Sequence, residues 1–442
     1  MHILMLTNTY LPLVGGVARS VDWFARAYRA RGHRVLIVAP RFERRDERAE
    51  NVDEAEDERD VVRVPSICNF NGSPFAVRLP VPGYLTDVVR GFRPDIVHSH
   101  HPFLLGDTAL RIAARQNVPL VFTHHTMYER YTHYLPGDSE FLRSFVSDLA
   151  TGYANRCDVV FAPSESVARI LVERGVEKPI RVIPTGIDID HFQSGDRALG
   201  RSRHGLPADA KVIGHVGRLA HEKNLAFLAT AVATALESEP DACFLVVGEG
   251  PSRKVIEEVF AARGLTGSLR LAGRRSGQEL VDAYAAMDVF AFASLTETQG
   301  MVLTEAMAAG APVVAIDAPG AREVVKDEEN GRLLPEDASE DAFAEALLWT
   351  LREEAARRGA LSEAARRTAA KFAMGRVADR ALAEYERLLA EERSFGQEGI
   401  WDSALRVLEA EWELWATFAH AAGTALEDVS LRGEGASDSR DR

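Results

Sequence analysis

Cysteine is scarce in this chain of 442 residues: Cys68, Cys157 and Cys243 lie far apart and form no C-x-x-C pair. We therefore expect neither a disulfide framework nor a thiolate zinc site, and a cytoplasmic protein. No apolar run approaches the length of a membrane span, and the apolar segment at residues 2–7 is too short for the core of a signal peptide. The formal net charge of −14 disfavours nucleic acid as a partner, because phosphate binding needs a basic face.

The chain also lacks the G-x-G-x-x-G motif with a distal acid that NAD-dependent enzymes carry. Short apolar runs nevertheless alternate with amphipathic stretches, which predicts α/β domains with helices flanking parallel sheets. The predicted strands are residues 3–7, 35–39, 61–64, 96–99, 120–123 and 159–162 in a first set, and 212–216, 243–247, 269–272, 289–293, 313–316 and 332–334 in a second. We therefore expect two doubly wound domains in tandem, with ligands at the carboxyl ends of the strands and in a cleft where two substrates could meet.

Residues 296–312 carry two glutamates, Glu297 and Glu305, eight positions apart. An apolar run of strand length precedes Glu297, and good helix formers follow Gly300, so we expect a strand, a tight turn and a helix. Free N–H groups at the start of that helix favour a phosphate, with one carboxylate on either side of it. A lone pair of glutamates at this spacing is more often solvated, so the interpretation depends on the rest of the chain.

Two cations follow the strand end at Gly217. Arg218 and Lys223 could grip a diphosphate from two sides, each charged hydrogen bond contributing about 1.5–3 kcal/mol. In isolation, an Arg and a Lys in a loop are usually just solvated.

Glycine-rich and basic turns complete the candidates for a phosphate or nucleotide ligand. Glycine allows a close backbone approach, although such turns are common at strand ends. The residues are Gly15, Gly16, Gly248, Gly250 and Arg274.

In this order, the segments resemble the retaining glycosyltransferases of family four, over about residues 3–389. The matching parts are Gly15-Gly16, residues 123–126 (THHT), residues 184–188 (PTGID), Gly217-Arg218 with Lys223, residues 248–250 (GEG), and Glu297 to Glu305. The resemblance implies a GT-B architecture, which consists of two facing Rossmann-like domains, here with a helical C-terminal extension. It also implies that the substrate is a nucleotide sugar.

The resemblance also implies roles for individual residues. By position, Glu297 holds hydroxyls of the donor sugar and Glu305 holds the ribose. Arg218 and Lys223 match the diphosphate clamp, and His125 matches the histidine that faces the reacting sugar from the acceptor domain. The predicted donor side further includes Thr298, Gln299, Gly300, Met301 and Val302.

Gln299 precedes Gly300 where family members often have Phe. Together with residues 125–134, it resembles a narrower branch, the bacterial diacylglycerol glucosyltransferases that use UDP-glucose. This implies a lipid acceptor, met at the inner face of the cell membrane through peripheral contact of the N-terminal domain. The acceptor candidates are His124, Tyr128, Tyr131, His133 and Tyr134, each of which could equally pack under a loop.

Two segments of the first half could touch a bilayer, residues 70–79 and 84–93. The pattern of the second favours an ordinary core-facing helix.

The predicted divisions are residues 1–187 for the acceptor domain, 188–371 for the donor domain, 372–432 for C-terminal helices, the first packing across a domain edge, and 433–442 for a disordered tail. We interpret residues 41–60, a dense run of mixed charge, as a solvated, partly disordered insertion, and Trp401, Trp412 and Trp415 as part of an apolar packing stripe.

Neither a metal nor another cofactor is expected. The D-x-D at residues 188–190 resembles the manganese site of another glycosyltransferase fold, but it lies in the predicted connection between the domains. The histidines at 98, 100, 101, 124 and 125 lie at strand ends without a matching carboxylate and without helical spacing.

The expected chemistry is a front-face transfer in the cleft. Breaking the C1–O bond of the donor leaves negative charge on the diphosphate, which the cations and the helix N-terminus stabilise. The departing diphosphate helps to remove the acceptor proton. Two alternatives remain open: transfer to a soluble sugar, sugar phosphate or inositol compound, and a sugar-nucleotide 2-epimerase, which needs no acceptor.

Substitution tests the predicted roles of Glu297 and Arg218. Glu297→Gln and Arg218→Ala should each slow transfer about 100-fold or more, because each removes charge complementary to the transition state, while the fold stays intact. Steady-state rates and circular dichroism of both variants provide the measurement. Near-wild-type turnover in both would refute the assignment.

Overall fold

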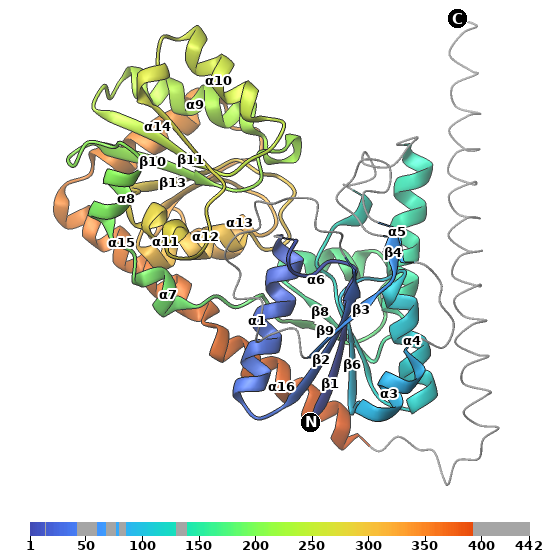
Figure 1. Cartoon of the computed structure of the whole chain (residues 1–442). Coiled ribbons are helices and arrows are strands. Elements are labelled where there is room, and N and C mark those ends of the chain that lie inside the picture. The colour runs from blue at the N-terminus through green and yellow to red at the C-terminus, as the bar shows by residue number, and fades with distance from the viewer. Residues whose placement is uncertain (14, 42–59, 68–76, 79–84, 130–138, 392–442) are drawn as a thin grey trace, which may run out of the picture. The chain divides into compact units, whose positions relative to one another are not determined.

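The computed structural model describes residues 1–13, 15–41, 60–67, 77–78, 85–129 and 139–391 (Figure 1). The chain divides into two compact units, one formed by Met1–Ile183 with the chain from Ala378 onward, the other by Pro184–Val377. Helix α16 (Met374–Ala390) therefore begins in the second unit and continues in the first. The predicted insertion at 41–60, the tryptophan stripe and the tail lie almost wholly outside the described residues.

Seven parallel strands form the sheet of the first unit, in the order β3-β2-β1-β6-β7-β8-β9. They are β1 (His2–Leu6), β2 (Arg34–Pro40), β3 (Val61–Val64), β6 (Ile96–Ser99), β7 (Leu120–Thr123), β8 (Val159–Ala162) and β9 (Ile180–Val182). A separate antiparallel pair joins β4 (Ser66–Ile67) and β5 (Val77–Arg78). The structure confirms the six predicted strands and adds β9, whose three half-buried residues make too short an apolar run to be recognised.

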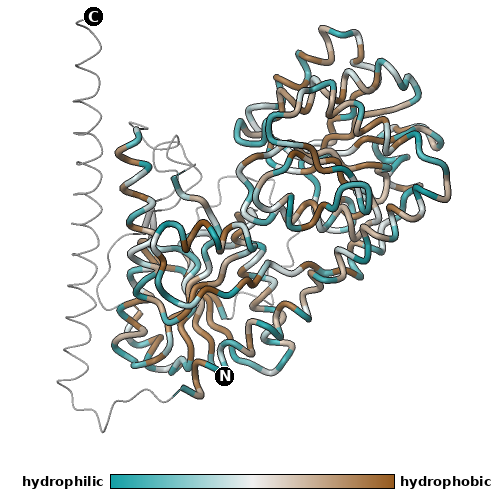
Figure 2. The backbone as a smooth tube through the Cα atoms, turned by 180° about the vertical axis from the view of Figure 1, so that it is seen from behind, coloured by the Kyte–Doolittle hydropathy of each residue, from teal (hydrophilic) through white to brown (hydrophobic). Residues whose placement is uncertain are grey.

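Helices cover both faces of this sheet (Figures 1 and 2). They are α1 (Gly16–Ala30), α3 (Thr86–Phe92), α4 (Leu105–Gln116), α5 (Glu140–Ala154) and α6 (Glu165–Glu173), with α16. Serines begin two of them, since Ser139 and Ser164 each accept a hydrogen bond from the backbone N–H three residues on, the geometry of an N-cap. Figure 2 shows the hydrophobic strands in the interior, as expected of parallel sheets buried on both faces.

Helix α3 faces the core. Leu85, Val89 and Phe92 are 6%, 4% and 9% exposed and belong to the apolar cluster that also contains residues of β1, β2 and α4. The ordinary core-facing helix favoured by the pattern is therefore what forms. The other candidate for bilayer contact, residues 70–79, lies almost entirely outside the described residues. Within the described part of the chain, no helix is both long and apolar enough to cross a membrane.

The second unit repeats the arrangement with six parallel strands in the order β12-β11-β10-β13-β14-β15. The strands are β10 (Lys211–Val216), β11 (Ala242–Val247), β12 (Leu269–Gly273), β13 (Val289–Phe292), β14 (Val313–Ile316) and β15 (Gly331–Leu334). All six match the predicted strands. The order is that of a doubly wound dinucleotide-type sheet, as is the order of the first unit apart from its extra edge strand.

Helices cover both faces of the second sheet as well, with α9, α10 and α14 on one face and α8, α11, α12 and α15 on the other (Figure 1). The helices are α7 (Ile189–Gln193), α8 (Arg197–Arg203), η4 (His221–Lys223), α9 (Leu225–Glu237), α10 (Arg253–Ala262), η5 (Thr266–Ser268), α11 (Gly277–Ala285), α12 (Met301–Ala309), α13 (Ala321–Val324), α14 (Glu340–Arg352), α15 (Ala355–Ala369) and η6 (Ala370–Phe372). Alanine-rich α9 is largely buried, and α10 and α14 pack closely against it.

The loops after β10 and β11 pack backbone against backbone. Leu219 N donates to Glu249 O at 2.9 Å, which leaves no room for side chains between the two loops. Gly248 has a φ of +144°, and a Cβ there would lie 1.8 Å from Gly217 O. A Cβ on Gly250 would lie 2.3 Å from Leu219 O. Backbone packing alone therefore requires glycine at both positions, whatever else the loops bind.

Alanine at Gly248 should destabilise the protein more than alanine at Gly264. Both glycines have positive φ, but nothing lies within 4 Å of a Cβ on Gly264. We expect Gly264→Ala to lower the free energy of unfolding by about 1 kcal/mol through backbone strain, and Gly248→Ala by about 3 kcal/mol through strain and overlap with Gly217 O. Denaturant unfolding measures both. Equal losses in the two variants would contradict this account.

Candidate active site

The strand order of the second unit reverses between β10 and β13, and the loops that follow these two strands meet there. Such a reversal leaves a crevice at the carboxyl ends of the strands, where ligands bind in sheets of this type. Ser294 Oγ and Thr296 Oγ1, from the loop after β13, donate to Glu222 O of the loop after β10 at 3.3 and 3.4 Å. The two loops therefore form one joined surface.

Three residues predicted from sequence to be catalytic lie on this surface. Lys223 Nζ is paired with Glu297 Oε1, and both side chains are mostly buried, at 15% and 21% exposure. Arg218 Nη2 is paired with Glu222 Oε1, whose side chain is only 5% exposed. Each predicted phosphate-binding cation thus has a carboxylate beside it, and an anionic ligand of Lys223 has to compete with Glu297.

The predicted phosphate-facing amides lie at the start of α12. Gly300 takes the left-handed conformation with a φ of +70° and is the N-cap, and no side chain caps the helix. Leu303 N closes the first turn on Gly300 O at 2.9 Å. A helix that begins in this way directs the N–H groups of Met301 and Val302 towards the preceding turn, where an anion is favoured. Thr298 is half-buried in that turn.

Gln299 makes contacts that its place in the motif did not reveal. Its side chain is 5% exposed, its Oε1 accepts from Thr185 N at 2.6 Å, and its Nε2 donates to Thr185 O at 2.7 Å. The amide pairs with the backbone of Thr185 as a neighbouring strand would. The side chain thus ties the turn before α12 to the segment at residues 184–187, and a role in donor binding remains a prediction for its backbone.

Glu305 is fully buried in α12. Tyr284 OH, on α11, donates to Glu305 Oε2 at 2.6 Å, and the tyrosine ring packs edge-on against Phe192 of α7. Nothing in the spacing of the sequence pointed to Tyr284, since the contact joins residues 21 positions apart on two helices. Tyr284 fixes the carboxylate to which the resemblance gives the ribose.

His215 is a further residue that sequence reasoning missed. It lies on β10 with 1% exposure, and its Nδ1 is 3.0 Å from Ala291 O of β13, to which it donates. Burial lowers the pKa of His215 to about 4, so the ring is neutral. The signal available in the sequence was a polar residue inside the otherwise apolar run of β10. A Cβ on Gly217 would lie 3.5 Å from His215 Nε2, an ordinary contact.

Arg274 and the first glycine loop complete the predicted donor side. Arg274 follows β12 and is exposed. In the first unit, Gly15 is the N-cap of α1, Gly16 is its first residue, and a Cβ on Gly15 would meet nothing within 4 Å. Unlike Gly248 and Gly250, Gly15 has open space beside it.

A cluster of five buried or half-buried histidines lies at the carboxyl ends of β6 and β7 in the first unit: His98, His100, His101, His124 and His125. His100 Nδ1 and His125 Nε2 are 2.9 Å apart. Asn8 N donates to His101 Nδ1 at 3.1 Å, which joins the loop after β1 to the cluster. Burial lowers the pKa of His125 and of three neighbours to about 3, and it also lowers the pKa of His100 well below its ordinary value, so the cluster is uncharged.

The acceptor candidates divide between this cluster and the segment that follows it. His124 is 1% exposed, with its ring edge-on to Phe122 and to Tyr128. Tyr128 also packs against Phe103, and burial raises its pKa, so its hydroxyl stays protonated. Tyr131, His133 and Tyr134 lie outside the described residues.

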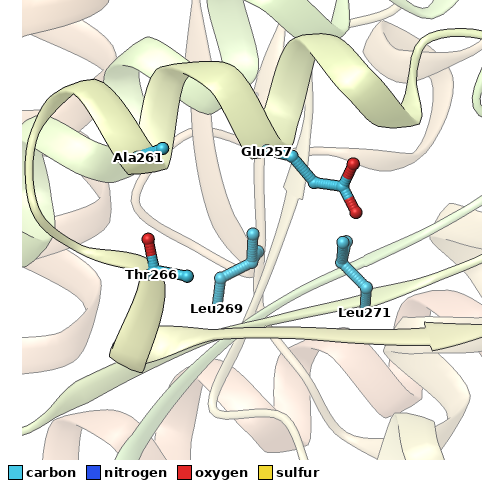
Figure 3. Close-up of a pocket in the computed structure, with 5 residues that line it drawn as sticks. All are labelled: Glu257, Ala261, Thr266, Leu269 and Leu271. Carbon is cyan, nitrogen blue, oxygen red and sulfur yellow. The ribbon is translucent and has the colours of Figure 1, made fainter.

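A cavity of about 360 Å³ lies elsewhere in the second unit, between α10 and the edge strand β12 (Figure 3). Its lining consists of Glu257, Ala261, Thr266, Leu269 and Leu271. None of these residues was a site candidate, and the cavity is apolar apart from two side chains. Among residues 1–391 with their gaps, no three His, Cys, Asp or Glu side chains gather as metal ligands would.

Two family models match the chain in succession, Glycosyltransferase Family 4 over residues 14–191 and Glycosyl transferases group 1 over residues 196–368. An alpha-monoglucosyldiacylglycerol synthase of Streptococcus pneumoniae is 31% identical over 343 residues, 75% of each chain. A GDP-mannose-dependent alpha-mannosyltransferase of Mycobacterium tuberculosis is 31% identical over 390 residues, 87% of this chain and 96% of that protein. The solved structure of Anabaena Alr3699/HepE in complex with UDP matches with a TM-score of 0.68 at 23% identity, over 88% of this chain and 100% of that one, which confirms the GT-B architecture.

Leucine at Gln299 should destabilise the second unit. Gln299→Leu leaves the N–H and C=O of Thr185 buried without the amide, at a cost of about 1–3 kcal/mol each. The matched control is Gln278→Leu, which removes an exposed amide bonded to Asp282 and should cost under about 1 kcal/mol. Denaturant unfolding compares the two variants. A loss at Gln299 no larger than that at Gln278 would show that the paired amide contributes little.

Proposed function

The chain belongs to glycosyltransferase family 4 and is a hexosyltransferase, and from this premise we propose that it transfers glucose from UDP-glucose to a lipid acceptor such as diacylglycerol, with retention of configuration. The proposed reaction takes place at the inner face of the cell membrane. It needs no metal ion.

One observation carries the proposal: the second unit gathers two cations, a carboxylate and an uncapped helix N-terminus at the reversal point of its sheet. Cations and backbone N–H groups suit a diphosphate, and a carboxylate suits the hydroxyls of a sugar. A nucleotide sugar carries these groups side by side in one molecule.

The ion pair between Lys223 and Glu297 has to open when the donor binds in the proposed way. The donor diphosphate displaces Glu297 from Lys223. The freed carboxylate then accepts hydrogen bonds from the hydroxyls of the sugar, so that phosphate and sugar are bound together.

Transfer then proceeds on one face of the sugar. The C1–O bond to the diphosphate breaks, and Arg218, Lys223 and the N–H groups of Met301 and Val302 stabilise the negative charge that develops. An oxygen of the departing diphosphate takes the proton of the acceptor hydroxyl, and the acceptor oxygen attacks C1 from the same side. The bond to the acceptor thereby keeps the original configuration.

The choice of glucose and of a lipid acceptor is supported by the match to the glucosyldiacylglycerol synthase and by Gln299 before Gly300. The competing choice of GDP-mannose is supported by the mannosyltransferase, which is equally identical and matches more of the chain. A few atoms in the pocket decide such a choice of substrate.

A matrix of donors and acceptors tests the proposal. The protein is incubated with UDP-glucose, GDP-mannose or UDP-N-acetylglucosamine, each with diacylglycerol micelles, glucose, a sugar phosphate or inositol, and products are identified by chromatography and mass spectrometry. We expect an α-glucosyl lipid from UDP-glucose with diacylglycerol. Glu297→Gln in the same assay controls for a contaminating activity, since its product should fall about 100-fold.

Other outcomes of this matrix discriminate between the alternatives. A product only with GDP-mannose would replace the donor, and a product only with a soluble acceptor would remove the lipid. Conversion of a nucleotide sugar into its epimer without any acceptor would identify a 2-epimerase.

A further inference from the structure

His100 lies beside His125, the residue that the resemblance placed against the reacting sugar. His100 follows β6 and His125 follows the neighbouring strand β7, so the sheet itself brings the two together. The ring nitrogens His100 Nδ1 and His125 Nε2 are 2.9 Å apart. The rings are nearly parallel, with centroids 5.2 Å apart and planes inclined by 22°. The two rings therefore meet edge to edge, through these two nitrogens.

The side chains behind His100 hold it in place. His98 packs on the His100 ring with centroids 4.2 Å apart. Both nitrogens of His98 are themselves engaged: Nδ1 with Tyr385 OH of α16 at 2.6 Å, and Nε2 with Thr123 Oγ1 at 2.7 Å. Tyr385 OH in turn lies 3.2 Å from Tyr28 OH of α1. These hydrogen bonds hold the His98 ring, and the His100 ring that packs on it therefore cannot turn freely. His100 thus presents a fixed nitrogen to His125.

We propose that His100 is a positioning residue, which fixes the orientation and the tautomer of His125 by donating from Nδ1–H to His125 Nε2. The inference rests on the proposed function, because it assigns a task to His125. His100 itself touches no substrate in this account and acts through His125.

The direction of this hydrogen bond follows from the other nitrogen of His100. His100 Nε2 is buried and has no partner among the described residues. If the proton were on Nε2, a buried N–H donor would be left unpaired, and buried unpaired donors are rarer than buried unpaired acceptors. The proton therefore lies on Nδ1, and His125 Nε2 accepts. Burial lowers the pKa of both rings, so neither carries a second proton near neutral pH.

The chemical consequence concerns what His125 can do for a sugar. With Nε2 engaged as an acceptor, neutral His125 carries its proton on Nδ1, and the ring can only donate from there. His125 then serves as an oriented hydrogen-bond donor, and the acceptor proton goes to the diphosphate as proposed above. A displacement of a reacting group by about 1 Å can cost about 100-fold in rate, so holding the ring still is a sufficient task for His100.

Nitrogen NMR of the imidazoles tests the tautomer without any substrate. The protein is labelled with ¹⁵N at its histidine rings, and His125→Asn identifies the signals of His125 among those of the 13 histidines. We expect His125 to be protonated at Nδ1 in the wild type and in His100→Asn, whose amide N–H stands where Nδ1–H stood. Substitution of leucine or glutamine at 100 should release His125 into a mixture of tautomers. Protonation of His125 at Nε2 in the wild type, or an unchanged tautomer in both releasing variants, overturns the inference.

Kinetics tests the positioning role. His100→Leu and His100→Gln should lower kcat about 10- to 100-fold with the donor KM changed less than about 3-fold, whereas His100→Asn should keep kcat within about 3-fold of the wild type. Glutamine places its amide where Nε2 stood, so it provides the contrast with asparagine even if the leucine variant does not fold. Equal kcat values for the asparagine and glutamine variants, at equal thermal midpoints, would overturn the proposal.

The two failures can be told apart. If the wild-type protein transfers no sugar from any donor, the proposed function fails, and the NMR experiment still decides the bond between His100 and His125. If the wild type is active and His100→Gln is as active, the positioning role alone fails.

Discussion

In each unit, the strand order of the parallel sheet reverses between two central strands, and the loops that follow these two strands meet. This reversal decides where the polar residues of the candidate site lie. In the second unit, it brings the loop after β10 against the loop after β13, so that Lys223 meets Glu297 and Ser294 reaches the backbone of Glu222. In the first unit, β1 and β6 are the corresponding neighbours, and the loop after β1 meets the histidine cluster through Asn8 and His101. The sheets bury their apolar residues on both faces, and the polar residues of the candidate site lie at the strand ends.

The two units satisfy these polar groups in different ways. The second pairs charges, so that Arg218 and Lys223 each lie beside a carboxylate. The first uses neutral imidazoles, which burial keeps unprotonated and which bond to one another, to Thr123 and to Tyr385. Charge suits a site that binds a diphosphate, because a ligand can exchange one ionic partner for another. Neutral rings suit a site whose geometry must stay the same with and without ligand.

Sequence reasoning found nearly all of the fold, because buried parallel strands give apolar runs that can be seen locally. It recovered the six strands of the second unit and six of the seven in the large sheet of the first, and it missed β9, whose residues are only half-buried, and the two-residue strands β4 and β5. The family resemblance supplied candidate site residues, but it could not supply their partners. Tyr284 bonds to Glu305, and Gln299 to Thr185, across 21 and 114 positions, and such pairs leave no mark in local spacing. Only the folded chain shows that Gln299 is a structural side chain as well as a motif residue.

Because α16 begins in the second unit and continues in the first, the polypeptide passes from one unit to the other twice, once after Ile183 and once after Val377. The segment that follows the first passage is hydrogen-bonded to the segment that precedes the second, since Ile187 N donates to Phe372 O at 2.8 Å and Met374 N to Ile187 O at 2.9 Å. A single cleavage of the backbone at either passage therefore leaves only one of the two segments of the first unit covalently attached to the second unit. The first unit is also discontinuous in the sequence, with Tyr385 delivered to His98 only after the whole second unit has been synthesised. During translation, the histidines of the cluster thus emerge from the ribosome early, but His98 receives its hydrogen-bond partner Tyr385 only near the end.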